Sequence, residues 1–273
     1  MRYRTMTWLV GGLVLALAAQ AGAQDEKEYM AVLLDGRKIG YAEHTRKAAG
    51  GKVTTSEVME LTIGRAGTGM TVRQSETSIE TEGGKPLGFA SLQDIGLMTQ
   101  KVEGKVEGGK VTITPGVGGQ ATTKTMDWPQ GAVLAEGARL IEVAKGLKEG
   151  TSYTIKAFSP SLLQALDTET TVGGSKEVDL FGRVVTLTEV RSSAKGPTGK
   201  IDMTGYVDDQ YNARKVIAPM MGMSIILMAS FMSLAFEESP VGILLRSGPL
   251  KRMRCWRRET LKNLRPGCLM YDV

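Results

Sequence analysis

Apolar and polar residues alternate with a period of two through most of the chain. Within 53–63, for example, Met59 and Leu61 alternate with Glu60 and Thr62. This alternation predicts strands that pack one face and leave the other in water, as antiparallel sheets do. The same pattern predicts further strands over 29–34, 38–45, 70–82, 89–98, 100–107, 111–114, 122–128, 153–158, 168–172, 177–180, 183–190, 199–207 and 214–219.

Turn residues separate these runs. Glycine accepts the positive φ of tight hairpin turns, so a glycine pair between two apolar runs marks a hairpin tip. Asp35-Gly36 is a further two-residue turn signal of the same kind. The glycine pairs that we interpret as hairpin tips are 50–51, 83–84, 108–109, 118–119 and 173–174.

A segment with helical periodicity interrupts the strands. Leu134, Ala138 and Ile141 recur at helical spacing within 132–148, which predicts one helix. A second short helix is expected to start at Ser159-Pro160, because proline is favoured in the first turn of a helix. We therefore expect a mainly β (α+β) fold, in which a curved antiparallel sheet or half-barrel is covered by one or two helices.

The first residues have the pattern of a cleavable secretory signal peptide. Arg2 and Arg4 precede an apolar run over 6–19, and small residues at 21–23 form an A-x-A cleavage site. We expect residues 1–23 to be this signal, or alternatively an uncleaved anchor. The protein is then exported, to the periplasm or the extracellular space.

Two further regions follow the signal in this interpretation. Residues 24–236 form the antiparallel β domain, and residues 237–273 form a connector and a basic tail. The run 216–236 carries no charge over 21 residues, long enough for a transmembrane helix. Pro219, Gly222 and a β-like stretch favour instead a buried strand followed by a helix start near Ser233.

Charge excludes a nucleic-acid-binding body. The net charge is +5, but Arg2 and Arg4 lie in the signal, and residues 251–273 hold seven Lys or Arg and two acids. Residues 24–250 are left with a net charge of −2, and their charges are interspersed as on a solvated face. The basic tail is expected to be disordered or a non-native extension, with contact to anionic lipid as the alternative.

Residues with catalytic or metal-binding chemistry are few. His44 is the one histidine, and we interpret it as an exposed strand position beside Glu43. A nucleophile elbow, a phosphate loop between a strand and a helix, and metal-ligand spacings are all missing from the sequence. Cys255 and Cys268 both lie in the tail, paired or unpaired, and neither is expected to be catalytic. We therefore predict no catalytic, cofactor-binding or metal-binding residues.

Three segments resemble a known family. Residues 29–41, 211–228 and 234–240 are similar to the opening strands, the end and the following connector of the N-terminal β-region in bacterial exported transglutaminase-like proteins. In that family a separate downstream domain with Cys, His and Asp carries the chemistry. The resemblance thus implies the non-catalytic region without the catalytic domain, and no catalytic residue transfers to this chain.

Two functions remain open on the sequence alone. The first is a non-enzymatic envelope domain that serves as an accessory or interaction module for an unknown protein partner. The second is a carrier of a hydrophobic ligand, because the layout is also similar to periplasmic lipoprotein-carrier-like half-barrels. In that case residues 220–232, rich in Met, and the helix over 132–148 are expected to line the apolar face. Membrane contact through 216–236 or 251–273 is a third possibility.

Overall fold

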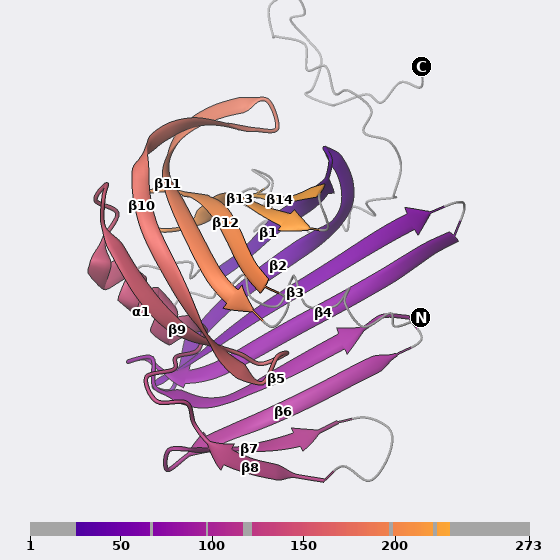
Figure 1. Cartoon of the computed structure of the whole chain (residues 1–273), viewed down its shortest axis with the longest axis vertical. Helices are drawn as coiled ribbons and strands as arrows, with labels where there is room; N and C mark the ends of the chain where they lie inside the picture. Colours follow the sequence, from indigo (N-terminus) through magenta and orange to yellow (C-terminus); the bar gives the residue numbers. More distant parts are fainter. Residues whose placement is uncertain are drawn as a thin grey trace, which may run out of the picture. The chain divides into compact units, whose positions relative to one another are not determined.

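The described residues fold into a curled antiparallel sheet with one helix (Figure 1). The computed structural model describes residues 26–65, 68–96, 98–116, 122–196, 199–220 and 223–229. The first meander comprises β1 (Glu26–Leu34), β2 (Arg37–Ala49), β3 (Lys52–Arg65), β4 (Thr68–Thr81), β5 (Pro86–Asp94), β6 (Thr99–Glu107), β7 (Lys110–Pro115) and β8 (Lys124–Asp127).

A helix, α1 (Ala135–Lys145), separates the two meanders. The second meander comprises β9 (Ser152–Ser159), β10 (Gln164–Leu180), β11 (Arg183–Gly196), β12 (Gly199–Val207), β13 (Ala213–Met220) and β14 (Met223–Ala229). Neighbours in the sequence pair within each meander, and β1 pairs with β14 to join the two halves into one sheet of fourteen described strands. Because of that join, β8 and β9 are the two edges of the described sheet.

The sheet curls far enough for its two ends to overlap. Phe158 of the edge strand β9 packs against Phe89 of β5, with ring centroids 5.2 Å apart, and against Trp128 beyond β8, at 4.6 Å. By the alternation along each strand, Phe89 faces the concave side of the sheet and Phe158 the convex side. The concave face of β5–β7 therefore lies over the convex face of β9, with no ladder between β8 and β9.

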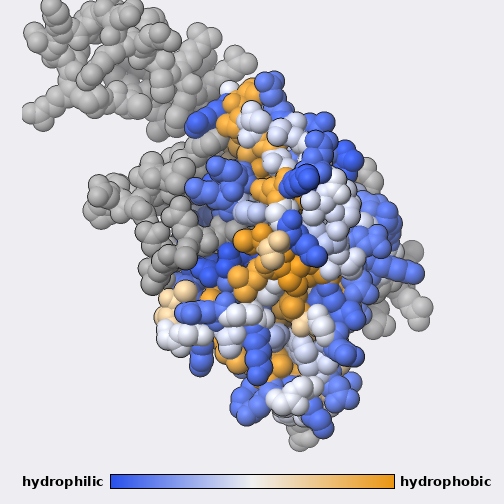
Figure 2. All heavy atoms as spheres, turned by 90° about the vertical axis from the view of Figure 1, so that its left-hand side faces the viewer, coloured by the Kyte–Doolittle hydropathy of each residue, from blue (hydrophilic) through white to orange (hydrophobic). Residues whose placement is uncertain are grey.

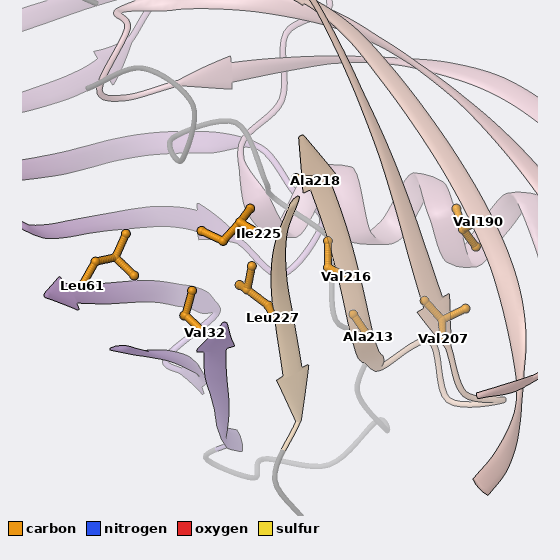
Figure 3. Packing of buried hydrophobic residues seen from close by; sticks show 9 residues of the cluster. All are labelled: Val32, Leu61, Val190, Val207, Ala213, Val216, Ala218, Ile225 and Leu227. Atoms are coloured by element: carbon orange, nitrogen blue, oxygen red, sulfur yellow. The ribbon is translucent and has the colours of Figure 1, made fainter. Parts of the chain in front are cut away.

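The main hydrophobic cluster lies on the concave face. It joins β1, β3 and β11–β14, and Figure 3 shows its nine buried residues. Gly40 of β2 pairs with both Val32 and Leu61, and its missing side chain leaves these two larger residues room on the same face. An added Cβ at Gly40 would collide with the carbonyl oxygen of Glu60, so the position requires glycine.

A second apolar layer covers part of the convex face. Gly173-Gly174 shifts the register of β10 against β11, and the far end of this long hairpin bends over β1 and β14. Val178 and Leu180 of the hairpin are buried there against Met228. The prediction that 173–174 is a hairpin tip is therefore wrong. The pair forms a bulge within one strand, since Val172 and Ser175 both keep partners on β11.

The other turn predictions have mixed outcomes. The turns at 35–36, 50–51, 83–84 and 108–109 are confirmed as links between paired strands, whereas 118–119 lies outside the described residues.

The helix predicted from Ser159-Pro160 is wrong, because Ser159 ends β9 and residues 160–163 turn directly into β10. Leu163 has a φ of 53°, which a right-handed helix cannot contain.

The helix over 132–148 is confirmed in shortened form as α1. Ala138 of α1 packs on Ile155 of β9, on the concave side of the sheet. Within 216–236, residues 216–220 belong to β13 and residues 223–229 to β14, as the strand interpretation predicts; residues 221–222 and 230–236 lie outside the described range. The described helix is too short and too polar to cross a membrane.

Candidate functional site

The first five strands place one row of polar residues across the concave face. Paired residues of antiparallel strands point to the same side of the sheet, so the register of the ladders defines such rows. Successive pairs join β1 to β2, β2 to β3, β3 to β4 and β4 to β5. The residues of this row, the acidic row, are Glu28, His44, Glu57, Glu76 and Ser91.

His44 lies in the middle of the acidic row and not on an exposed face. Its side chain is 14% exposed, and its Nδ1 lies 3.5 Å from Oε1 of Glu57. Neither ring nitrogen has a hydrogen-bond partner in the described part of the chain. The interpretation of His44 as an exposed position beside Glu43 is thus wrong. Glu43 faces the opposite side of β2, where it pairs with Lys27 at 3.0 Å.

Glu28 ends the acidic row in an ion pair. Arg214 of β13 donates from Nη1 to Glu28 at 2.6 Å and from Nε to Asp208 at 2.8 Å. Burial raises the pKa of Glu28, and the neighbouring Arg214 charge opposes that shift. This guanidinium thus balances the charge of Glu28.

Glu76 has only uncharged hydrogen-bond donors among the described residues. It accepts hydrogen bonds from the backbone N–H of Ser161, at 3.3 Å, and from Nε2 of Gln74, at 3.4 Å. Burial raises the pKa of Glu76 to about 7, and the facing charge of Glu57 adds to the shift. Protonation of this carboxyl group is therefore easier than that of an exposed glutamate.

The neighbouring row on the concave face, two residues further along each strand, is largely apolar. Met30, Ala42 and Met59 continue from β1 to β3 and are only partly buried. Gln74 and Gln93 complete this row on β4 and β5. Gln93 is 7% exposed, yet its Nε2 has no hydrogen-bond partner among the described residues.

On the other side of the acidic row, a charge network attaches α1 to the sheet. Arg46 of β2 and Arg139 of α1 each donate two hydrogen bonds to Glu136, over distances of 2.6 to 3.0 Å. Although burial raises the pKa of Glu136, the two guanidinium groups lower it overall. Glu80 of β4 accepts the backbone N–H groups of Glu136 and Gly137 at 2.6 and 3.0 Å, and so caps the helix.

The comparisons with known proteins give a fold and no function. No family model and no curated protein matches the chain. It is similar to the crystal structure of a β-barrel-like protein of the domain of unknown function DUF1849 from Brucella abortus, with a TM-score of 0.56 and 13% identity. The match covers 76% of this chain and 96% of that one. Identity this low shows a common fold alone.

The described residues hold no group of three or more His, Cys, Asp and Glu placed to bind a metal ion. Cys255, Cys268 and the signal over 1–23 lie outside the described range.

The expectation that the Met-rich stretch 220–232 lines the concave face is wrong for Met228, which is buried on the convex side with Leu33. Met223 of the same stretch is in phase with Ile225 and Leu227 on the concave face, and Met30, Met59 and Met203 pack against the buried cluster there.

Sequence reasoning missed the acidic row, although the strand pattern contains a signal for it. Glu57 falls in the apolar phase of β3, in step with Met59 and Leu61. A charged residue in the packed phase of a strand is uncommon, and it is therefore an informative feature of the sequence. The pairing of this carboxylate with Glu76 depends on the register between β3 and β4, which the pattern alone does not supply.

Proposed function

We propose that this chain is a non-enzymatic envelope module whose concave face binds an apolar ligand. The observation that carries the proposal is the incomplete burial of apolar side chains on that face. Met30, Met59, Ile39 and Met203 pack against the buried cluster but stay partly accessible. Apolar side chains facing a concave surface are the usual lining of small-molecule sites.

The contrast between the two faces of the same strands supports this proposal. On β3, Leu61 is 4% exposed on the concave face. On the convex face, the hydroxyl groups of Ser56 and Thr77 of β4 are hydrogen-bonded at 2.6 Å. The hydroxyl groups of Thr62 and Thr71 lie 3.4 Å apart there, so this surface is polar. A ligand that needs apolar contacts is therefore expected on the concave side. The envelope location is part of the proposal, and the predicted signal over 1–23 supports it.

Mass spectrometry under native conditions, after gentle purification from the expressing cells, tests the proposal. We expect a fraction of the protein to carry an added mass that organic solvent extracts as an apolar small molecule. A clean mass of the bare polypeptide, from protein whose circular dichroism shows the folded sheet, contradicts the proposal.

A second candidate is an accessory module of transglutaminase-like proteins. The two long segments that resemble that family, 29–41 and 211–228, contain strands that lie side by side, since β1 pairs with β14. They thus form one continuous surface that a partner could contact. This candidate predicts no amide-transfer activity in the purified chain. Thiol-dependent activity that Cys268→Ala abolishes contradicts it.

A further inference from the structure

Two carboxylates of the acidic row face each other directly. Glu57 of β3 and Glu76 of β4 are register partners, and like charges in that position destabilise an antiparallel pair. Within the described residues, Nδ1 of His44 lies 3.5 Å from Oε1 of Glu57 and can form an ion pair with it. The hydrogen-bond donors to Glu76 are uncharged. A cation between the two carboxylates would turn this repulsion into attraction.

Unsatisfied polar groups beside the carboxylates point to the same place independently. The Nε2 of Gln93 and both ring nitrogens of His44 are buried without a hydrogen-bond partner in the part of the chain that the structure describes. Gln93 is register partner to Gln74, which bonds to Glu76, so its amide lies on the same face. A buried polar group without a partner is unfavourable, so a partner supplied by a ligand would recover free energy.

Three arginines beside the acidic row are already engaged in ion pairs. Arg46 and Arg139 both bind Glu136, and Arg214 binds Glu28 and Asp208. These arginines are therefore not free for the carboxylate or phosphate of an anionic amphiphile. The charge of the acidic row instead complements a cationic headgroup.

We propose that the concave face recognises an amphiphile with a primary ammonium group, held between Glu57 and Glu76. Its alkyl chain lies over Met59 and Met30, and an oxygen next to the ammonium accepts a hydrogen bond from Gln93. The inference rests on the proposed function, because it names the headgroup of the apolar ligand. It adds that charge, and not apolar contact alone, selects the ligand.

Calorimetric titration of the purified protein with decylamine, decanol and decanoate, each below its micelle concentration or solubility limit, tests the inference. The three probes share one alkyl chain and differ in headgroup charge. We expect decylamine to bind about tenfold more tightly than decanol, and decanoate more weakly than decanol, because hydrogen bonds to charged groups are the stronger ones.

Variants separate headgroup recognition from apolar binding. Glu57→Gln and Glu76→Gln are expected to weaken decylamine binding about tenfold each and to leave decanol binding within about twofold. Both remove a like-charge repulsion, so the sheet is expected to fold. The control is Glu60→Gln, because Glu60 lies on the convex face of β3, 3.4 Å from Tyr41.

The outcomes distinguish this inference from the function on which it rests. Equal affinity for decylamine and decanol, tighter binding of decanoate, or an equal loss in Glu60→Gln overturns the ammonium site but leaves an apolar binding face. A folded protein that binds none of the three probes overturns both proposals.

Discussion

Glu136 is the residue where burial and charge are most tightly balanced. It is 1% exposed and accepts four hydrogen bonds from two guanidinium groups, which are themselves almost fully buried. The single carboxylate of Glu136 is thus the main counter-charge for two buried guanidinium groups. Removing the carboxylate charge would leave both arginines buried without their main partner.

We therefore predict that Glu136→Gln lowers the free energy of unfolding by about 3 kcal/mol, as expected when a buried ion pair loses one partner. The measurement is urea denaturation followed by circular dichroism. The matched control is Glu103→Gln, which breaks a surface pair with Lys101 at 2.7 Å and is expected to cost less than about 1 kcal/mol. Equal losses in the two variants would show that the network around α1 adds no stability.

Glu142 gives the folded state a pH dependence. It lies on α1 near Tyr153, and burial raises its pKa from the ordinary 4.5 to about 8, while Arg139 opposes the shift. The folded protein thus retains a proton that the unfolded chain releases near 4.5. The stability from that proton is full below about pH 4.5 and is lost as pH rises through about 8.

Glu142 is expected to contribute to the change of unfolding free energy with pH. The unfolding free energy is expected to fall between about pH 5 and pH 9. In Glu142→Gln this fall is expected to be smaller by roughly 1–2 kcal/mol, after allowance for the partial exposure of the Glu142 side chain. Urea denaturation at both pH values measures it. Glu60→Gln, on the convex face, serves as the control. A slope that Glu142→Gln leaves unchanged would assign the pH dependence to other groups.

At the scale of elements, α1 is held against the sheet through glycine. A Cβ built on Gly137 of α1 would lie 2.8 Å from the Cβ of Val133 and 2.9 Å from the carbonyl oxygen of Gly84. Gly84 follows β4 and has a φ of 75°, which a residue with a side chain adopts only with strain. The close approach of these two backbones lets Glu80 reach the first turn of the helix.

This contact predicts an unusual effect of alanine within a helix. Gly137→Ala would ordinarily stabilise a helix by about 1 kcal/mol, but the collision is expected to make it destabilising by about 1–2 kcal/mol. Thermal or urea unfolding measures the difference. In the control, Gly83→Ala, the added Cβ would meet only the Thr81 hydroxyl at 3.8 Å, and little change is expected. A gain in stability for Gly137→Ala would contradict this close packing of the helix on the sheet.

The sequence pattern predicted the strands and most hairpin tips because both are local properties. Alternation in 53–63 and the turn at Asp35-Gly36 each depend on a few neighbouring residues. The same alternation could not separate a tip from a bulge at 173–174, since glycine serves both conformations. Nor could it predict the short turn after Ser159, where proline follows the end of a strand without starting a helix.

At the scale of the whole described fold, long-range pairing decides the architecture. The ladder between β1 and β14 joins residues near opposite ends of the described chain, and Phe158 meets Phe89 only after the sheet overlaps itself. Such contacts depend on the curvature of the full sheet, so no local pattern shows them. The acidic row depends on them only partly, because its residues come from consecutive hairpins.

The surface outside the concave face also carries apolar residues. Figure 2, which views the side of α1, β9 and β10, shows a band of hydrophobic residues bordered by hydrophilic ones. Val143 of α1 is 38% exposed, and Phe181 and Val184 at the tip of the β10–β11 hairpin are 51% and 62% exposed. Any ligand-binding experiment must therefore distinguish the concave face from this outer surface.

Binding of the neutral dye N-phenylnaphthylamine to two variants on opposite faces of β3 makes that distinction most directly. Met59→Gln removes apolar surface from the concave face, and Val58→Thr does so on the convex face. We predict that Met59→Gln weakens dye binding about tenfold, as loss of one apolar side-chain contact allows, while Val58→Thr changes it less than about twofold. Equal affinity in both variants and the unaltered protein would contradict a ligand site on the concave face.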